Sequence, residues 1–196
     1  MMTDIDFKLD PKHTAVVVID LQKGILAFRG NSPEVKIVVA NAARLLAAAR
    51  SAGAKPVLVH VGFSPDGGDR LNKPVDQAMG SAGVPPPDWT DFIPELDQQP
   101  SDITLFKRQW GAFYGTDLDL QLRRRGITSI VLCGIATEIG VESTARFAYE
   151  YGYELAFASD AMTGISPESH ANSIERIFPR MGRVRTTEQI IAALQA

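Results

Sequence analysis

Residues 14–20 constrain the fold of this chain most strongly, because they form a short, β-branched apolar run that does not alternate and that ends in an acid. A strand with one face in water alternates between apolar and polar side chains, whereas a strand buried on both faces is apolar throughout. Strands of the second kind occur in parallel sheets that helices cover on both sides. The run therefore predicts a central strand of a parallel sheet.

A helix is predicted after this strand. Ser32, Pro33 and Glu34 supply an N-cap, a proline for the first turn and an acid near the helix N-terminus. Apolar residues then follow at helical spacing until Gly53: Val35, Val38, Val39, Ala42, Leu45, Leu46 and Ala49. The strand and this amphipathic helix form the first unit of a repeating pattern.

The alternation of strands and helices continues to the end of the chain. Further strands are predicted at 56–61, 103–107, 129–134, 154–158 and 182–185. Further helices are predicted at 117–125, 141–151, 167–180 and 187–194. This alternation predicts a three-layer, Rossmann-like α/β sandwich with a mostly parallel sheet. We expect six strands, in the order 3-2-1-4-5-6.

The length of 196 residues fits one domain that buries a single core without disulfides or a structural metal. Residues 62–100 interrupt the alternation, since this segment is rich in Gly, Pro and Asp. A connection of this length is typical of a functional lid or an oligomer contact, and a surface excursion without a role is the alternative. We expect one domain over residues 1–196 with a loop insertion at about 62–100.

Charge and cysteine content narrow the class of protein. A net charge of -3 offers no basic surface for nucleic acid. No apolar stretch is long enough to span a bilayer, and the acidic start of the chain does not have the pattern of a signal peptide. The single cysteine, Cys133, lies in an apolar strand and is expected to be inert packing. We therefore expect a cytoplasmic protein that binds a small molecule, and neither nucleic acid nor a membrane.

Polar groups follow three of the predicted strands. Asp20 ends the first strand, Lys107 ends the third, and residues 134–141 link the fourth to a helix. In open α/β sheets, ligands bind beyond the carboxyl ends of the strands. A buried aspartate is costly unless it is paired, and N–H groups at a helix start can stabilise an anion. These segments predict one active-site cleft, although the charged pair alone could be structural.

The ordered set of these segments resembles the isochorismatase-like hydrolases, a family that includes isochorismatases, nicotinamidases and N-carbamoylsarcosine amidases. The resemblance covers nearly the whole chain from about residue 14, and residues 107–118 are most similar to the YecD-like branch of the family. It is carried by Asp20-Leu21-Gln22, Lys107, Gly111-Ala112-Phe113, Gly115-Thr116-Asp117-Leu118, Gly134-Ile135-Ala136-Thr137 and Val141-Glu142-Ser143-Thr144-Ala145.

The resemblance implies a catalytic triad that is incomplete in this chain. Asp20 and Lys107 match the Asp and Lys of the cysteine-dependent members, but Gly140 stands at the position of their cysteine. Without a thiolate, no covalent acyl-enzyme can form there. Isochorismatases also have glycine at this position, which implies that Asp20 protonates a vinyl ether before water adds. Lys107 opposes this role, because a nearby cation favours the ionised aspartate.

Further residues are expected to line the substrate pocket: Gln22, Gln109, Trp110, Phe113, Ala136, Thr137, Ile139 and Val141. Gln109 stands where isochorismatases have an arginine, so a dianionic substrate would lack that guanidinium unless Arg70 or Arg108 replaced it. The resemblance also implies a non-proline cis peptide between Ile135 and Ala136, and a homodimer or a larger homo-oligomer.

Neither a metal nor a cofactor is expected, because His60 has no histidine partner nearby in the sequence. His60 is interpreted as a packing residue, and His170 as a packing residue or an oligomer contact. The sequence thus predicts a hydrolase of a small, anionic metabolite that uses no covalent cysteine intermediate. A non-catalytic binding protein and a water-dependent amidase remain as alternatives.

Overall fold

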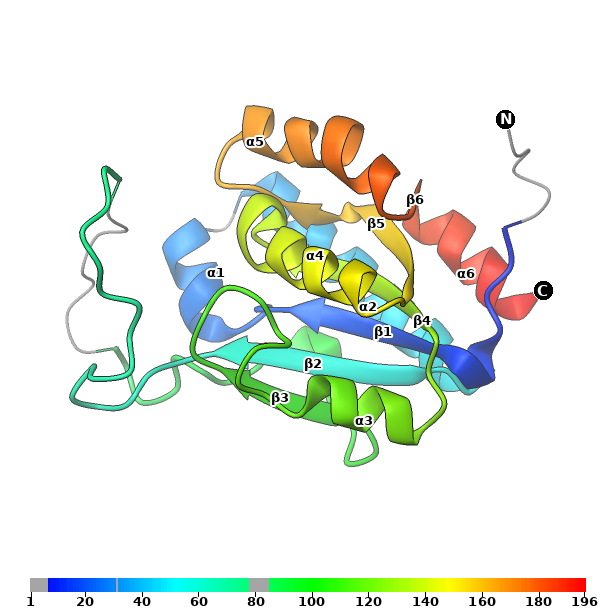
Figure 1. The fold of residues 1–196 in the computed structure, drawn as a ribbon, viewed down its shortest axis with the longest axis horizontal. Coiled ribbons are helices and arrows are strands. Elements are labelled where there is room, and N and C mark those ends of the chain that lie inside the picture. Colours follow the sequence, from blue (N-terminus) through cyan, green and yellow to red (C-terminus); the bar gives the residue numbers. More distant parts are fainter. Residues whose placement is uncertain (1–6, 31, 78–84) are drawn as a thin grey trace.

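A parallel sheet forms the centre of the computed structural model, which describes residues 7–30, 32–77 and 85–196 (Figure 1). In these residues the sheet has six strands in the order β3-β2-β1-β4-β5-β6, so the predicted strand order is confirmed. All residues of β1 are buried, as its unbroken apolar run requires. The strands are β1 (Thr14–Ile19), β2 (Lys55–Val61), β3 (Ile103–Lys107), β4 (Ser129–Ile135), β5 (Glu154–Thr163) and β6 (Arg183–Arg185).

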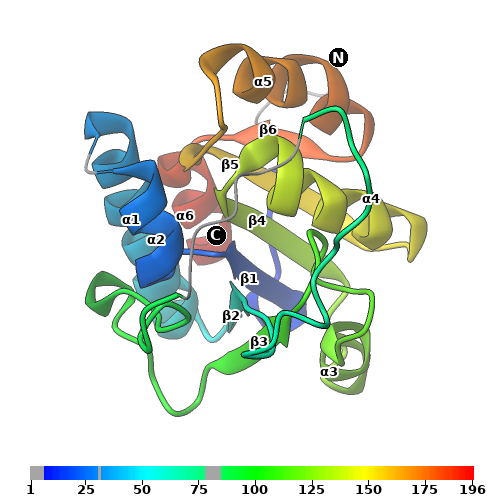
Figure 2. The ribbon, with the colours of Figure 1, turned by 90° about the vertical axis from the view of Figure 1, so that its left-hand side faces the viewer.

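Helices cover both faces of the sheet, as the alternation predicts (Figure 2). The helices α1 (Lys23–Arg29), α2 (Pro33–Ala52) and α6 (Thr187–Gln195) lie on one face. On the other face lie α3 (Leu118–Arg124), α4 (Glu142–Glu150) and α5 (Pro167–Asn172). The sheet therefore separates two apolar clusters, which together fix the positions of the strand ends.

Two elements differ from the prediction. Helix α1 was not predicted, because its N-cap, Gln22, makes no capping hydrogen bond and only Gly24 of its residues is buried. The predicted helix at 167–180 is wrong in its second half. There α5 gives way to a π-helical turn (Ser173–Ile177) and a 3-10 turn (Phe178–Arg180). Pro179 lies in the last turn and has no N–H for a helical hydrogen bond.

Other short turns are 3-10 turns at Pro11–His13 and Pro94–Leu96 and a π-helical turn at Thr137–Val141. The last helix, α6, begins with a capping box formed by Thr186 and Gln189. None of the described helices is both long and apolar enough to cross a bilayer.

The long segment after β2 extends further from the sheet than any other part of the described chain (Figure 1). Residues 78–84 of the expected insertion lie outside the described ranges. Beyond them, Phe92 forms an isolated antiparallel bridge with Gln22, and Lys23 makes ion pairs with Asp88 and Asp91. The returning part of the segment is therefore tied to the start of α1, and its role as a lid or an oligomer contact stays a prediction.

Candidate active site

A buried ion pair lies at the carboxyl ends of β1 and β3. Lys107 Nζ donates to Asp20 Oδ2 over 2.7 Å and to the carbonyl of Gln109 over 3.1 Å. Only 2% of Lys107 and 6% of Asp20 is exposed. The partner predicted for Asp20 from the sequence is therefore present, and the pair is shielded from water.

The backbone of Asp20 turns sharply at the end of the strand. Its φ of 54° lies in the left-handed region, which aspartate tolerates better than most residues. Its N–H still donates to the carbonyl of Val59 over 2.9 Å, so the residue remains anchored to β2. This turn ends the strand and leaves the carboxyl group where it meets Lys107.

Burial dominates the acidity of Asp20. It raises the pKa of the carboxyl to about 6, against the charge and the hydrogen bond of Lys107, which lower it. Oδ1 is buried and has no hydrogen-bond partner among the described residues. One oxygen therefore binds the lysine, and the other is available to hold or release a proton near neutral pH.

Gly140 lies directly beside this carboxyl group. A Cβ at position 140 would be 3.3 Å from Asp20 Oδ2 and 3.5 Å from the carbonyl oxygen of Trp110. It would also be 2.8 Å from Cγ2 of Ile19, which would have to move slightly. The ends of β1 and β3 and the turn after β4 thus meet at one place, as predicted, and a side chain at 140 would lie directly beside the Asp20 carboxyl.

Strands β1 and β4 can approach this closely because of Gly134. Its φ is 119°, and a Cβ there would lie 2.1 Å from the carbonyl oxygen of Ile19. No side chain fits at that distance from backbone, so glycine is required for both its conformation and its size.

The turn between β4 and α4 carries the predicted cis peptide, between Ile135 and Ala136. The N–H groups of Ile139 and Val141 donate to the carbonyl of Ala136 over 3.1 and 3.2 Å. The turn closes on its own first carbonyl. These two N–H groups are therefore occupied by a backbone carbonyl, and contacts of residues 136–141 with a substrate stay a prediction.

The model of the Isochorismatase domain family matches residues 14–189 of the chain. The chain belongs to the isochorismatase family. It is 53% identical to the "Uncharacterized isochorismatase family protein YecD" of Escherichia coli O157:H7, over 95% of this chain and 99% of that protein. The predicted resemblance to the YecD-like branch is therefore confirmed.

A solved structure of an isochorismatase family protein from Burkholderia thailandensis is 44% identical, with a TM-score of 0.88, and the match covers 96% of this chain and 98% of that one. A more distant relative is the ureidoacrylate amidohydrolase RutB of Methylorubrum extorquens, which is 30% identical over 95% of this chain and 86% of that protein.

Two of the residues expected to line the pocket of this isochorismatase family member are engaged with protein groups. The Gln22 amide is fully buried, donates to the carbonyls of Val61 and Trp89 over 3.0 and 3.1 Å, and accepts from the N–H of Val61 over 2.7 Å. Gln109 donates to the carbonyls of Gly111 and Tyr114. Both amides hold loops in place, and a substrate contact through either stays a prediction.

The aromatic residues after Lys107 divide between core and surface. Phe113 is buried against the rings of Tyr151 and Tyr153, with centroids 5.4 and 6.0 Å away. Trp110 is 49% exposed. Of the two, Trp110 is the one that can offer an apolar surface to a ligand, because Phe113 is part of the hydrophobic core.

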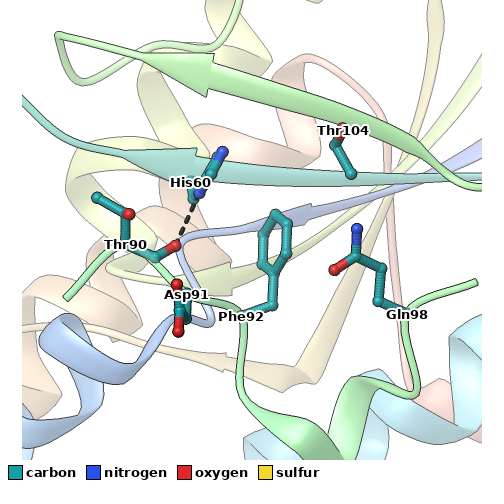
Figure 3. A pocket seen from close by; sticks show the side chains of 6 residues that line it. All are labelled: His60, Thr90, Asp91, Phe92, Gln98 and Thr104. Carbon is teal, nitrogen blue, oxygen red and sulfur yellow. Dashed lines mark hydrogen bonds between the residues drawn. The ribbon is translucent and has the colours of Figure 1, made fainter. Parts of the chain in front are cut away.

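His60 packs at the sheet edge as expected. Its Nδ1 lies 2.7 Å from the carbonyl oxygen of Thr90, and its ring stacks on Phe92 with a centroid distance of 4.7 Å (Figure 3). These residues line an open pocket of about 400 Å³ together with Asp91, Gln98 and Thr104. None of the lining residues is a predicted site residue. Among the described residues, no three His, Cys, Asp or Glu side chains are grouped to hold a metal.

Cys133 is fully buried, and its Sγ lies 4.0 Å from the carbonyl oxygen of Val17. Burial raises the pKa of this thiol to about 12, with a smaller contribution from the charge of Asp160. The thiol therefore stays protonated at neutral pH, which agrees with the expected role in packing.

Sequence analysis did not single out Glu138 and Arg29, both of which hold the backbone near the site. Ile165 N donates to Glu138 Oε1, and Arg29 donates to the carbonyls of Gly164 and Ile165. Glu138 could have been noticed in the sequence, because it is an acid within residues 134–141, which were expected to bind an anion. A carboxylate in such a region needs a partner of its own. Nothing in the sequence pointed to Arg29.

Proposed function

We propose that this protein is a hydrolase of a small metabolite in which Asp20 transfers the proton and water takes the place of a thiol nucleophile. The observation that carries the proposal is the buried Asp20 carboxyl, with its pKa raised to about 6 and a glycine, Gly140, directly beside it in place of a nucleophilic side chain. A general acid works best when its pKa lies near the operating pH. An ordinary exposed aspartate would be ionised there.

The chemistry that fits this arrangement is the hydrolysis of a vinyl ether. Protonated Asp20 donates its proton to the terminal vinyl carbon, which leaves an oxocarbenium ion at the ether carbon. Water adds to that carbon and gives up a proton to the Asp20 carboxylate, and the resulting hemiketal releases an alcohol and a ketone, which is pyruvate when the substrate is an enolpyruvyl ether. Lys107 stabilises the carboxylate that Asp20 becomes after the transfer.

Two arginines could replace the guanidinium that is missing at Gln109, and they differ in their partners. Arg108 makes an ion pair with Asp69 and lies 4.6 Å above the ring of Phe106. Arg70 lies 5.0 Å above the ring of Phe63 and makes no ion pair with any described residue. Of these two arginines, Arg70 is the one without an ion pair among the described residues, and we propose it as the contact for a substrate carboxylate.

Amide hydrolysis is the second candidate, favoured by the relationship to the ureidoacrylate amidohydrolase RutB. In that reaction ionised Asp20 would act as a base and remove a proton from the attacking water. No acyl-enzyme would form, because Gly140 provides no nucleophile.

The test is to incubate the protein with isochorismate and, separately, with ureidoacrylate, N-carbamoylsarcosine and nicotinamide, while following pyruvate and ammonia. Asp20→Asn is the matched control for each substrate. We expect pyruvate release that depends on Asp20. Release of ammonia alone would favour the amidase, and calorimetric binding without either product would overturn the proposal in favour of a non-catalytic binding protein.

A further inference from the structure

The turn between β5 and α5 is held from two sides by opposite charges. Ile165 N–H donates to Glu138 Oε1 over 2.7 Å. Arg29 donates through Nη1 to the carbonyl of Ile165 over 3.3 Å and through Nη2 to the carbonyl of Gly164. An acid from the β4–α4 turn and a base from the end of α1 thus both bind the peptide unit between Gly164 and Ile165, and Arg29 also binds the carbonyl of the next unit.

Gly164 makes room for this contact. A Cβ at that position would lie 2.5 Å from Glu138 Oε2 and 3.1 Å from both the backbone nitrogen and the Cβ of His170. Its φ is not in the left-handed region, so glycine is needed here for its size alone. Any side chain at 164 would displace the Glu138 carboxylate.

A second contact joins the same two regions. Thr137 Oγ1 lies 2.8 Å from His170 Nδ1, and Thr137 is completely buried. Thr137 and Glu138 are neighbours in the chain, so two successive residues of the β4–α4 turn are bound to the segment that contains α5. In Figure 2 the link from β5 to α5 passes between α1 and the start of α4.

These contacts close a circuit around the site. Helix α1 begins three residues after Asp20 and ends at Arg29, which binds the 164–165 turn. That turn binds Glu138, and two residues later Gly140 lies with its Cβ position 3.3 Å from Asp20 Oδ2. The path returns to the carboxyl group from which it starts.

The circuit contains buried polar atoms that make no hydrogen bond with the described residues, which lowers the stability of the fold. Glu138 Oε2 and Arg29 Nε are both buried and have no hydrogen-bond partner among the described residues. A buried polar atom without a partner is unfavourable, and a native structure that keeps one usually has a reason. The 164–165 turn provides that reason, since Glu138 Oε1 and both terminal nitrogens of Arg29 bind its backbone.

We propose that Glu138 and Arg29 are positioning residues, which hold the 164–165 turn between them and thereby fix residues 136–141 against Asp20. Neither residue touches the reacting atoms in this role. The proposal rests on the proposed function only for the location of the site, and its test needs no substrate. A failed activity screen would therefore leave it standing.

The test uses Gly140→Cys as a reporter background, in which the new thiol lies beside Asp20. The alkylation rate with iodoacetamide is measured against pH, alone and combined with Glu138→Ala, Glu138→Gln, Arg29→Ala or Gly164→Ala. If the circuit positions the turn, Glu138→Ala, Arg29→Ala and Gly164→Ala each raise the thiol pKa. Labelling at pH 7 then falls about fivefold or more, because less thiolate is present.

Glu138→Gln separates position from charge. Its amide oxygen can still accept from the Ile165 N–H, so labelling should stay within about twofold of the background or rise slightly, because a negative charge is lost. Glu168→Ala, which removes an exposed acid from the first turn of α5 outside the circuit, should have no effect. Equal changes in Glu138→Ala and Glu138→Gln, or no change in either, would overturn the proposal.

A second readout covers variants in which the thiol is poorly reactive. With Gly140 intact, the Asp20 carboxyl is titrated by carbon-13 NMR in Glu138→Ala, Glu138→Gln and Arg29→Lys. We expect the pKa of Asp20 to fall more in Glu138→Ala than in Glu138→Gln, since a loosened turn admits water. Arg29→Lys keeps the charge but replaces a two-donor contact, and it should shift the pKa in the same direction. Identical titrations in all three variants would contradict the circuit.

Discussion

Asp20 and Cys133 lie on neighbouring strands, since Val18 is the partner of Cys133 in the sheet and Asp20 comes two residues after Val18. Both side chains are buried, and burial raises the pKa of each group, to about 6 for the carboxyl and about 12 for the thiol. Desolvation therefore brings the pKa of the carboxyl close to neutral pH, where a group can both donate and accept a proton. It moves the pKa of the thiol far above neutral pH.

The Asp20 carboxyl has polar surroundings, whereas the Cys133 thiol has apolar ones. Asp20 has a charged partner in Lys107, one oxygen without a hydrogen bond among the described residues, and a glycine, Gly140, beside its other oxygen. Cys133 belongs to an apolar cluster on one face of the sheet. Burial therefore acts differently at the two places: at the end of β1 it raises the pKa of a carboxyl toward neutrality, and within β4 it keeps a thiol protonated.

The largest expected effect comes from replacing Asp20 by a residue that cannot transfer a proton. Asp20→Asn keeps the size of the side chain but cannot transfer a proton, so kcat/KM should fall about 10²- to 10⁴-fold on the substrate that the screen identifies. Steady-state kinetics on the folded variant measure this. Full activity in Asp20→Asn would show that the chemistry lies elsewhere.

The pH profile distinguishes the two possible roles of Asp20. If it acts as an acid, the protonated form is active, and kcat/KM falls about tenfold per pH unit above the pKa of about 6. If it acts as a base, the ionised form is active, and kcat/KM rises with pH up to about 6 and then levels off. We expect the falling profile, and a rate that does not change between pH 5 and 8 would exclude both roles.

Gly140→Cys adds a second thiol beside Asp20, while Cys133 stays buried in β4. A sulfur next to the ion pair of Asp20 and Lys107 and just before the start of α4 should have a lowered pKa, so iodoacetamide should label the variant at least about tenfold faster than wild type at pH 7. Gly140→Ser is the control, since it also displaces the Ile19 methyl group but adds no thiol. Equal labelling of variant and wild type would show that the strand ends do not form the predicted site.

The smallest effect is expected at Cys133. Cys133→Ala removes one buried sulfur and leaves a small cavity, which should lower the free energy of unfolding by about 1 kcal/mol. Activity should stay within about twofold of wild type, because the thiol is neither ionised nor near the carboxyl. Urea denaturation and steady-state kinetics measure the two quantities, and loss of turnover in a still-folded variant would reverse the comparison with Asp20.

Much of the fold could be read from local patterns. The run at 14–20 indicated a doubly buried strand because apolar continuity is a direct consequence of burial on both faces. Helix α1 was not predicted from the sequence, because it has neither a capping side chain nor a buried apolar stripe. The helix at 167–180 was overextended because its apolar spacing continues through a π-helical turn and into Pro179.

The candidate site was predictable in its chemistry but less so in its geometry. The pair of Asp20 and Lys107 followed from the cost of a buried charge. The hydrogen bonds of Gln22 to Val61 and Trp89 did not, because they depend on where two distant loops lie. The position of Glu138 opposite Arg29 is a similar case. Glu138 follows β4 and Arg29 ends α1, but both bind the turn that follows β5.

The sequence by itself determined the parallel sheet, the residues that end its strands and the absence of a thiol at position 140, because periodicity and residue type are local properties. Only the tertiary structure decided that burial outweighs Lys107 in setting the acidity of Asp20. It also decided that two N–H groups of the β4–α4 turn are occupied and that Arg29 and Glu138 bind one turn. Desolvation and hydrogen bonding depend on which distant segments come into contact, and that is settled only when the chain has folded.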